Sequence, residues 1–179
     1  MSGIEFISYD DERHREKYME MCLEYCIWLD NEVFSYYGSR LFQDTTAEEV
    51  VEKYAPRWIS VKPPIGDIFI VEVDGEVAGM GRLNTLEEGI GGVHNIWIVT
   101  KHRGRKLATK LMMHIEKEAK EFGFSAVRLD TARFNIPAQK LYKKIGYYEI
   151  PRFTPVGTFE NDSLARYYNE KVYMEKQLT

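Results

Sequence analysis

One segment near the middle of the chain constrains the fold more than any other. The apolar run Ile96–Val99 predicts a strand, a short basic turn follows, and an amphipathic helix then carries Leu107, Leu111, Ile115, Ala119 and Phe122 on one face. A compact turn that leads from a strand into an uncapped helix presents free backbone N–H groups at the positive end of the helix dipole. Arg103, Arg105 and Lys106 add positive charge around these groups. We therefore expect an anion site at this turn, with a phosphate-bearing ligand as its guest.

Predicted strands and helices alternate around this unit. We expect strands at 4–9, 67–73, 76–83, 93–99, 124–131, 147–151 and 171–178, and helices at 11–35, 45–58, 104–122 and 136–145. Asp74-Gly75 predicts a two-residue hairpin, the glycine-rich stretch 87–92 predicts a second turn, and residues 152–170 are irregular and aromatic. This order predicts an α/β (α+β) fold with a mixed sheet. The basic turn then lies at the edge where open α/β sheets bind ligands.

Composition excludes several other classes of protein. With 179 residues, 44% hydrophobic and 29% charged, the chain suits one domain spanning residues 1–179. A net charge of −4 argues against a general nucleic-acid partner. No apolar run approaches the ~20 residues that span a bilayer and no signal pattern opens the chain, so we expect a cytoplasmic protein without a membrane partner. Cys22 and Cys26, without a further cysteine, make a poor zinc site, and we expect no metal.

Two sequence motifs indicate which phosphate-bearing ligand the turn binds. The sequence holds neither a dinucleotide nor a P-loop glycine pattern. Arg103–Ala108 (RGRKLA) resembles the R/Q-x-x-G-x-G/A loop of the GNAT superfamily of acyl-CoA-dependent N-acyltransferases, and Asn135–Tyr147 (NIPAQKLYKKIGY) resembles that family's N-x-x-A-x-x-L-Y-x-x-x-G-[FY] segment. The resemblance is clearest over 67–147, whereas the N-terminal helices and the residues after 150 match only in general layout.

The resemblance implies a sheet of about six or seven strands, mostly antiparallel, that splays into a V where coenzyme A binds, with about four flanking helices. It implies acetyl-CoA as cosubstrate, with backbone groups of Ile96, Trp97 and Ile98 pairing with the pantetheine arm like an added strand. The diphosphate would lie on the turn formed by Arg103, Gly104, Arg105, Lys106, Leu107, Ala108 and Thr109. Asn135 would hydrogen-bond the pantetheine, and Tyr142 would point its hydroxyl at the thioester sulfur.

One residue departs from the family pattern. Lys106 stands where the family has its central glycine, which lets the diphosphate approach the backbone closely. We expect Lys106 to adopt an ordinary helical φ and to reach a phosphate with its ammonium group. Coenzyme A binding would then be retained with an altered loop geometry.

Acyl transfer to an amine needs a proton donor for the leaving thiolate and an acceptor for the amine's proton. The sequence suggests no covalent Ser/His/Asp or Cys/His arrangement, so we expect direct attack in a ternary complex. Tyr142 is the candidate donor, and its alternative role is an aromatic core residue on a short helix.

Two residues are candidate bases. His94 leads because an unperturbed pKa near ~6.5 suits proton transfer, and alternation places it on the same strand face as Ile96 and Ile98. It is similar to a histidine of arylalkylamine acetyltransferases. Asp130, on the neighbouring strand, resembles a carboxylate of the acetyltransferases that act on ribosomal N-terminal alanines. Each residue also has a purely structural alternative. His94 would be a hydrogen-bonded core histidine, and Asp130 would be a strand-end residue that binds nearby amides.

The resemblance places the acceptor between the first helices and the later strands. The aromatic and polar residues predicted there are Tyr25, Trp28, Glu32, Phe34, Tyr36 and Tyr37 on one side and Arg133, Phe153, Phe159, Tyr167, Tyr168 and Asn169 on the other. An aromatic pocket with a carboxylate suits a cationic amine, and ordinary packing is the alternative. The sequence does not separate a small amine, an amino acid and a peptide N-terminus.

These features together predict an enzyme that transfers an acetyl group from acetyl-CoA to a primary amine. Two alternatives stay open. One is a catalytically silent coenzyme A-binding module, which the lysine in the loop and the lack of an acidic residue at the start of the strand would favour. The other is a different nucleotide-binding or partner-binding α/β protein. A homodimer is also left open.

Overall fold

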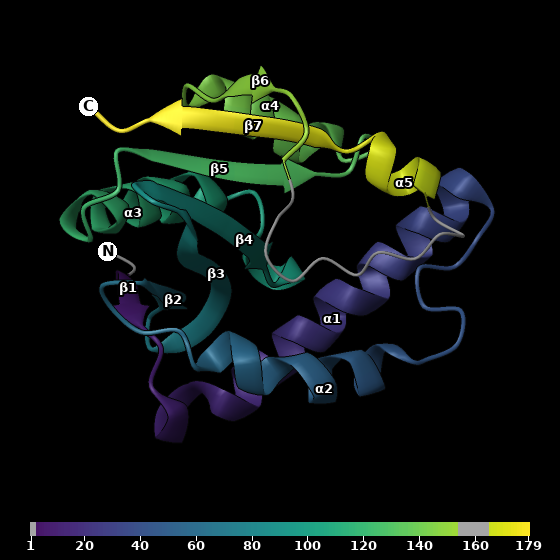
Figure 1. Cartoon of the computed structure of the whole chain (residues 1–179). Helices are drawn as coiled ribbons and strands as arrows, with labels where there is room; N and C mark the ends of the chain where they lie inside the picture. The colour runs from purple at the N-terminus through teal and green to yellow at the C-terminus, as the bar shows by residue number, and fades with distance from the viewer. Residues whose placement is uncertain (1–2, 154–164) are drawn as a thin grey trace.

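The computed structural model describes residues 3–153 and 165–179, and its strands form one seven-stranded sheet. The sheet has the order β1-β2-β3-β4-β5-β7-β6, and only the β4–β5 pair is parallel, so the expected mixed and mostly antiparallel sheet is confirmed (Figure 1). The strands are β1 (Ile4–Ser8), β2 (Gly66–Val73), β3 (Glu76–Glu87), β4 (Ile90–Ile98), β5 (Ala126–Thr131), β6 (Tyr148–Ile150) and β7 (Val172–Gln177). The helices are α1 (Asp11–Tyr37), α2 (Ala47–Ile59), the 3₁₀ turn η1 (Thr100–His102), α3 (Leu107–Glu121), α4 (Ile136–Lys144) and α5 (Ala165–Asn169).

Helices cover both faces of the sheet. α3 and α4 bury their apolar sides in one core cluster with Phe69, Val127 and Met174. α1 and α2 form a second cluster on the opposite face with Ile68, Ile70 and Met80. The spacing of apolar residues that predicted the central helix is the reason for this packing, because Leu107, Leu111, Ile115 and Ala119 are all buried on one side of α3.

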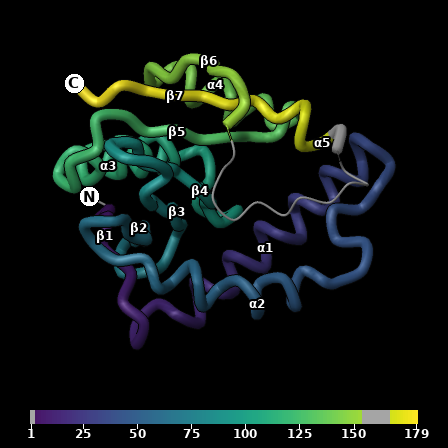
Figure 2. Tube along the Cα trace, viewed as in Figure 1, coloured from purple at the N-terminus to yellow at the C-terminus, as the bar shows by residue number. Residues whose placement is uncertain are grey.

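The sheet opens into a V between β4 and β5. These strands pair only over Ile90–Gly92 and Ala126–Arg128, which is the closed end of the V. Towards their C-terminal ends they diverge, and the arm of β5, β7 and β6 separates from the arm of β1–β4 (Figures 1 and 2). The expected splay is therefore confirmed, and within the described ranges 3–153 and 165–179 it leaves the second half of β4 without a ladder partner on that side. A free strand edge inside a fold offers backbone donors and acceptors to an extended ligand.

A β-bulge at Asn95 changes which face each β4 residue occupies. Arg82 of β3 pairs with His94, but Met80 pairs with Trp97, so β4 holds one residue more than β3 in this interval, and Asn95 has a φ of 53°. Ile96 packs into the α3 cluster, whereas His94 shares the opposite face with Arg82. The expectation that His94 lies on the same face as Ile96 was therefore wrong, because strict alternation does not hold across a bulge.

The glycine-rich stretch lies mostly within strands rather than in a turn. β3 runs to Glu87 and β4 starts at Ile90, so the predicted hairpin is present with a much shorter connection. A Cβ on Gly91 would lie 2.8 Å from Leu83 and 3.2 Å from Phe124, so the glycine makes room for packing across the strand pair. The segment expected to be irregular contains α5, and its residues 154–164 lie outside the described residues.

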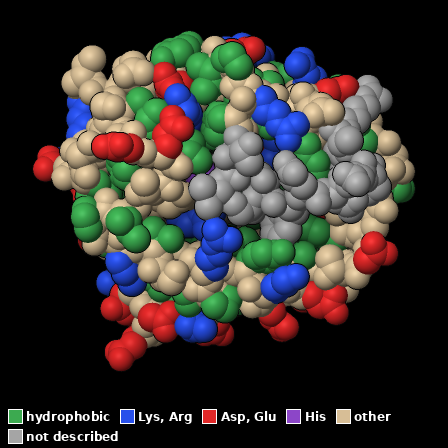
Figure 3. All heavy atoms as spheres, viewed as in Figure 1, with side chains coloured by type: hydrophobic (Ala, Val, Ile, Leu, Met, Phe, Trp, Pro, Cys, Tyr) green, Lys and Arg blue, Asp and Glu red, His purple; other side chains and the backbone are tan. Residues whose placement is uncertain are grey.

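The surface carries interspersed charges. Figure 3 shows acidic and basic side chains scattered over the described part of one face, among hydrophobic and other side chains. Among the described residues, no helix combines the length and the apolar character needed to cross a bilayer.

Candidate active site

The turn between β4 and α3 has the geometry of an anion site. α3 begins at Leu107 with no side-chain cap, so the N–H groups of its first turn lack partners within the helix. Lys106 precedes the helix with φ 60° and ψ 21°, a left-handed conformation. The expectation of an ordinary helical φ for Lys106 was therefore wrong. The turn keeps a backbone conformation that glycine favours and places a lysine in it.

The arginines of the turn are partly engaged with the protein. Arg103 donates from Nε to the carbonyl oxygen of Ile98 at 2.9 Å, and its guanidinium lies 4.6 Å from the Trp97 ring centroid. Arg105 lies 3.3 Å from Nδ1 of His102. Arg103 therefore fastens the turn to the end of β4, which fixes the direction of the uncapped helix start.

A cleft of about 590 Å³, called the outer cleft below, runs from this turn along the open edge of β4. It is lined by Tyr25, Trp28, Ile96, Trp97, Ile98, His102, Arg103, Gly104, Lys106, Leu107, Ala108, Thr109, Asn135, Pro137, Ala138, Leu141 and Tyr142. Arg105 alone, of the residues predicted to hold coenzyme A, is not among them. Uncapped amides at one end and an unpaired strand edge along the side fit a ligand with a diphosphate and an extended amide-bearing arm.

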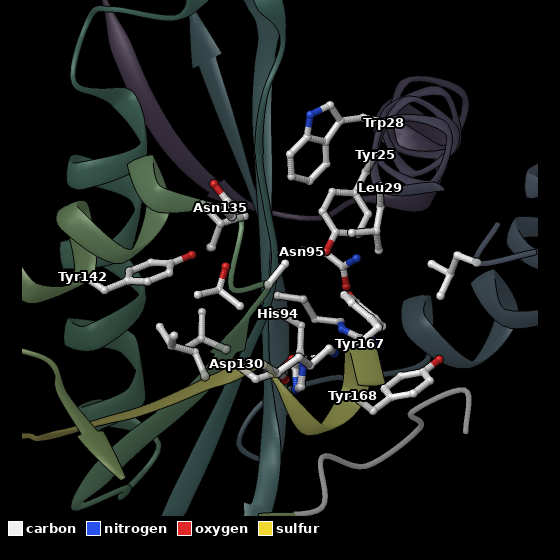
Figure 4. A pocket seen from close by; sticks show the side chains of 18 of the residues that line it. Tyr25, Trp28, Leu29, His94, Asn95, Asp130, Asn135, Tyr142, Tyr167 and Tyr168 are labelled. Carbon is white, nitrogen blue, oxygen red and sulfur yellow. Dashed lines mark hydrogen bonds and ion pairs between the residues drawn. The ribbon is translucent and has the colours of Figure 1, made fainter. Parts of the chain in front are cut away.

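α4 contributes two residues to the far wall of the outer cleft. Asn135 is the N-cap of α4, and its Oδ1 accepts from the N–H of Ala138 at 3.4 Å. This cap occupies the oxygen and leaves the side-chain NH₂ as a donor. Tyr142 lies two helical turns further on, with 8% of its surface exposed, and its hydroxyl points into the open space between the arms of the V (Figure 4). Burial raises the pKa of Tyr142 above its ordinary value, so its hydroxyl keeps its proton at neutral pH.

A second cavity of about 180 Å³, called the inner cavity, adjoins the outer cleft. Tyr25, Trp28, Ile96, Asn135 and Tyr142 line both spaces. The other residues that line the inner cavity are Leu29, Leu41, Trp58, Arg82, Val93, His94, Asn95, Leu129, Asp130, Thr131, Ala132, Tyr167, Tyr168 and Lys171. The two spaces therefore meet beside the hydroxyl of Tyr142.

Asp130 is held in an ion pair inside the inner cavity. Its Oδ2 lies 2.6 Å from Nζ of Lys171, and both side chains are 12% exposed. Burial acts to lower the pKa of Lys171, but the neighbouring carboxylate of Asp130 outweighs it, and the pKa lies above its ordinary value. The ammonium also lies 5.2 Å and 5.5 Å from the ring centroids of Tyr167 and Tyr168. Asp130 thus faces the cavity already paired with a lysine that sequence reasoning missed.

His94 is a neutral ring in the cavity wall. Burial, helped by the positive charge of Arg82, lowers its pKa to about 3. Its Nε2 is buried without a hydrogen-bond partner among the described residues. A pKa near the unperturbed value was the reason for choosing His94 as base, and that premise was wrong because the ring is buried and lies near the positive charge of Arg82.

Arg82 is a second cation that sequence reasoning missed. It is 9% exposed, on the β3 strand beside His94, and its guanidinium lies 5.6 Å from the Trp58 ring centroid. A signal was present, since an arginine interrupts an otherwise apolar and glycine-rich strand, Val77–Leu83. Lys171 offered no comparable signal, because a lysine at the start of a strand is common on protein surfaces.

Some of the residues predicted to bind the acceptor line the inner cavity, and others do not. Tyr25, Trp28, Tyr167 and Tyr168 line the inner cavity as expected (Figure 4). Glu32 does not: it is exposed on α1, and the prediction that it supplies a carboxylate to the pocket was wrong. Phe159 lies outside the described residues.

Among the described residues, no group of three His, Cys, Asp or Glu side chains is arranged to hold a metal ion. Cys22 and Cys26 are buried on α1, and burial raises the pKa of both thiols. They therefore act as small apolar core residues.

Comparison with known proteins identifies the family of this chain. The model of the acetyltransferase (GNAT) family matches residues 8–147, which include the V, the turn and α4. The chain belongs to the GNAT family of acetyltransferases. The matched segment of this GNAT chain holds all the residues that line the outer cleft, whereas the inner cavity also takes Tyr167, Tyr168 and Lys171 from beyond it.

Curated relatives cover part of the chain. An IAA acetyltransferase of Azospirillum brasilense is 31% identical over 118 residues, 65% of this chain and 71% of that protein. The uncharacterized N-acetyltransferase YjgM of Escherichia coli is 33% identical over 85 residues, 46% of this chain and 51% of that protein. The chain therefore matches between about half and seven tenths of the length of these two relatives.

A solved structure shows the same fold over nearly the whole chain. The PaiA N-acetyltransferase of Thermoplasma acidophilum, crystallised in complex with coenzyme A, superposes with a TM-score of 0.67 at 16% identity. The superposition covers 98% of this chain and 99% of that one. At this identity the likeness concerns the fold.

Proposed function

We propose that this GNAT protein transfers an acetyl group from acetyl-CoA to a primary amine by direct attack in a ternary complex. The observation that carries the proposal is the meeting of the outer cleft and the inner cavity beside the Tyr142 hydroxyl. One space suits a diphosphate-bearing ligand, and the other suits a small acceptor. Two reactants bound in adjoining spaces can react without a covalent enzyme intermediate.

The outer cleft would hold acetyl-CoA. The uncapped amides of the α3 N-terminus and the turn residues Arg103–Thr109 would bind the diphosphate, with the Lys106 ammonium beside it. The open edge of β4 at Ile96, Trp97 and Ile98 would bind the pantetheine, and the free NH₂ of Asn135 would donate from the opposite wall. When bound, acetyl-CoA supplies an acetyl thioester whose sulfur leaves as a thiolate.

Tyr142 would provide the proton that the leaving sulfur needs. Its hydroxyl points into the shared space, and its raised pKa keeps it protonated at neutral pH. A donor that stays protonated stabilises developing negative charge through a hydrogen bond, even where full transfer is completed by solvent.

The amine would enter the inner cavity in its neutral form. The guanidinium of Arg82 lines this cavity, and nearby positive charge lowers the pKa of a bound ammonium. His94, with a pKa of about 3, would accept a hydrogen bond from the amine as a neutral ring rather than titrate with it. Asp130 is the remaining candidate for the proton, and its pairing with Lys171 sets how freely it acts.

Release of free thiol from acetyl-CoA in the presence of an amine panel tests the proposal. Amine-dependent release, with the N-acetylated amine found by mass spectrometry, is the expected result. Tight binding of acetyl-CoA with no amine-dependent release would instead favour a silent coenzyme A-binding module. An absence of coenzyme A binding would refute both readings of the outer cleft.

A further inference from the structure

We propose that the acceptor carries a carboxylate and that Arg82 binds it, so that the substrate class is a small carboxylate-bearing primary amine such as an amino acid. This inference rests on the proposed acetyl transfer and names the chemistry of its acceptor. It replaces the cationic amine that the aromatic residues alone suggested.

Arg82 is a buried cation, and no carboxylate of the described residues (3–153 and 165–179) is paired with it. The residue is 9% exposed, and its Nε finds no hydrogen-bond partner in the part of the chain that the structure describes. No ion pair joins its guanidinium to any carboxylate among the described residues. A buried guanidinium that lacks a counter-ion is costly, because its hydration is lost without compensation. A ligand carboxylate would relieve this cost.

The charged residues described around Arg82 do not neutralise its guanidinium. Lys171 is already neutralised by Asp130, and His94 is a neutral ring. The exposed Arg57 on α2 adds a further positive charge near Arg82 without lining the inner cavity. Counted over the described part of the chain, the cavity therefore carries one uncompensated positive charge, which attracts an anionic group and repels a cationic one.

The geometry of the guanidinium suits a carboxylate. The ring of Trp58 lies beside it, with 5.6 Å between Cζ and the ring centroid. A guanidinium that packs a face on an aromatic ring keeps its N–H edge available, and that edge matches the two oxygens of a carboxylate.

The position of Arg82 sets how the acceptor lies. Arg82 lines the inner cavity but not the outer cleft, whereas Asn135 and Tyr142 line both. A carboxylate on Arg82 therefore occupies the deep end, and the amine of the same molecule faces the shared space. The volume of about 180 Å³ limits the acceptor to a small molecule.

Matched ligands and variants test this inference in the full-length chain. The ligands are a panel of amino acids, the corresponding carboxamides, and the amines that lack the carboxylate altogether. The variants are Arg82→Met, Arg82→Lys and the control Arg57→Met, which removes a neighbouring surface charge outside the cavity. Two readouts are taken: thiol release from acetyl-CoA, and the thermal midpoint with each ligand in the presence of coenzyme A.

The wild type should prefer the carboxylate over the carboxamide by about 10- to 100-fold in kcat/KM, the usual effect of a charge-assisted hydrogen bond. Arg82→Met should abolish this preference while raising the thermal midpoint of the unliganded protein, because it removes an uncompensated buried charge. Arg82→Lys should retain part of the preference, and Arg57→Met should retain all of it. Arg82→Lys decides the test if Arg82→Met does not fold.

An equal preference for carboxylate and carboxamide in the wild type, or an unchanged preference in both Arg82 variants, would overturn the inference while acetyl transfer to other amines stood. If no amine is acetylated, the proposed function fails. The thermal midpoints then decide whether carboxylates bind in an Arg82-dependent manner.

Discussion

Asp130→Asn removes one charge from a buried ion pair and leaves the other in place. The charged atoms of Asp130 and Lys171 are 2.6 Å apart, and both side chains are 12% exposed. At an effective dielectric constant of about 20, the direct attraction is about 6 kcal/mol, most of which offsets the cost of burying both charges. The variant keeps that cost for the ammonium and loses the attraction. We expect the free energy of unfolding to fall by about 3 kcal/mol, at the lower end for a broken buried pair because the amide oxygen still accepts a hydrogen bond.

A double-mutant cycle with Lys171→Met isolates this effect. The double variant Asp130→Asn/Lys171→Met has no buried charge at this position and should recover most of the lost stability. Urea denaturation at neutral pH, followed by tryptophan fluorescence, measures all four proteins. A loss below about 1 kcal/mol in Asp130→Asn, or a double variant as unstable as the sum of the single ones, would refute the reasoning.

The sign of the pH dependence gives an independent check. In the wild type the folded pKa of Lys171 is raised above 10.5, so its stabilisation is complete below that value and is lost as the pH rises through the folded pKa. In Asp130→Asn, burial is unopposed and lowers the pKa of Lys171. The unfolded state then binds more protons, and stability should rise with pH.

Three further results are expected. Tyr142→Phe should lower kcat by about 100-fold with little change in acetyl-CoA affinity; normal turnover would remove Tyr142 as proton donor. His94 has a pKa of about 3 against 6.5 unfolded, so it destabilises the fold as the pH falls below 6.5, by about 1.4 kcal/mol per unit; His94→Phe should abolish this dependence in denaturation curves, and an unchanged slope would contradict the burial argument. Lys106→Gly should change the thermal midpoint little, because relief of about 1–2 kcal/mol of left-handed strain is partly offset by the entropy of glycine in the unfolded chain; a large loss of stability would show that the lysine side chain holds the turn.

Local pattern was sufficient to predict most of the fold. The apolar spacing of α3 and the Asp74-Gly75 hairpin each depend on residues close together in sequence. The motif residues around Gly104 and Asn135 line the outer cleft for the same reason, since a turn and a helix start carry their own geometry.

The failures arise where distant contacts decide. The bulge at Asn95 is a mismatch between two strands, and no pattern within β4 reveals that His94 and Ile96 lie on opposite faces. The pKa of His94 depends on burial and on Arg82, one strand away. Lys171 and Asp130 are 41 positions apart in sequence, and they come into contact only because β7 pairs with β5.

The left-handed Lys106 belongs to a different class of failure. A lysine in that position opposes local preference, and the surrounding turn imposes the conformation. The fold around residue 106 therefore determines its backbone conformation, and the type of residue at that position does not.

Thiol release from acetyl-CoA, measured with the amine panel and with product mass spectrometry, tests the central claim most directly. The account predicts release that depends on the amine, yields its N-acetyl derivative and falls in Tyr142→Phe while acetyl-CoA still binds. Amine-dependent turnover that is the same in wild type and Tyr142→Phe, or binding of acetyl-CoA without turnover of any amine, would contradict it.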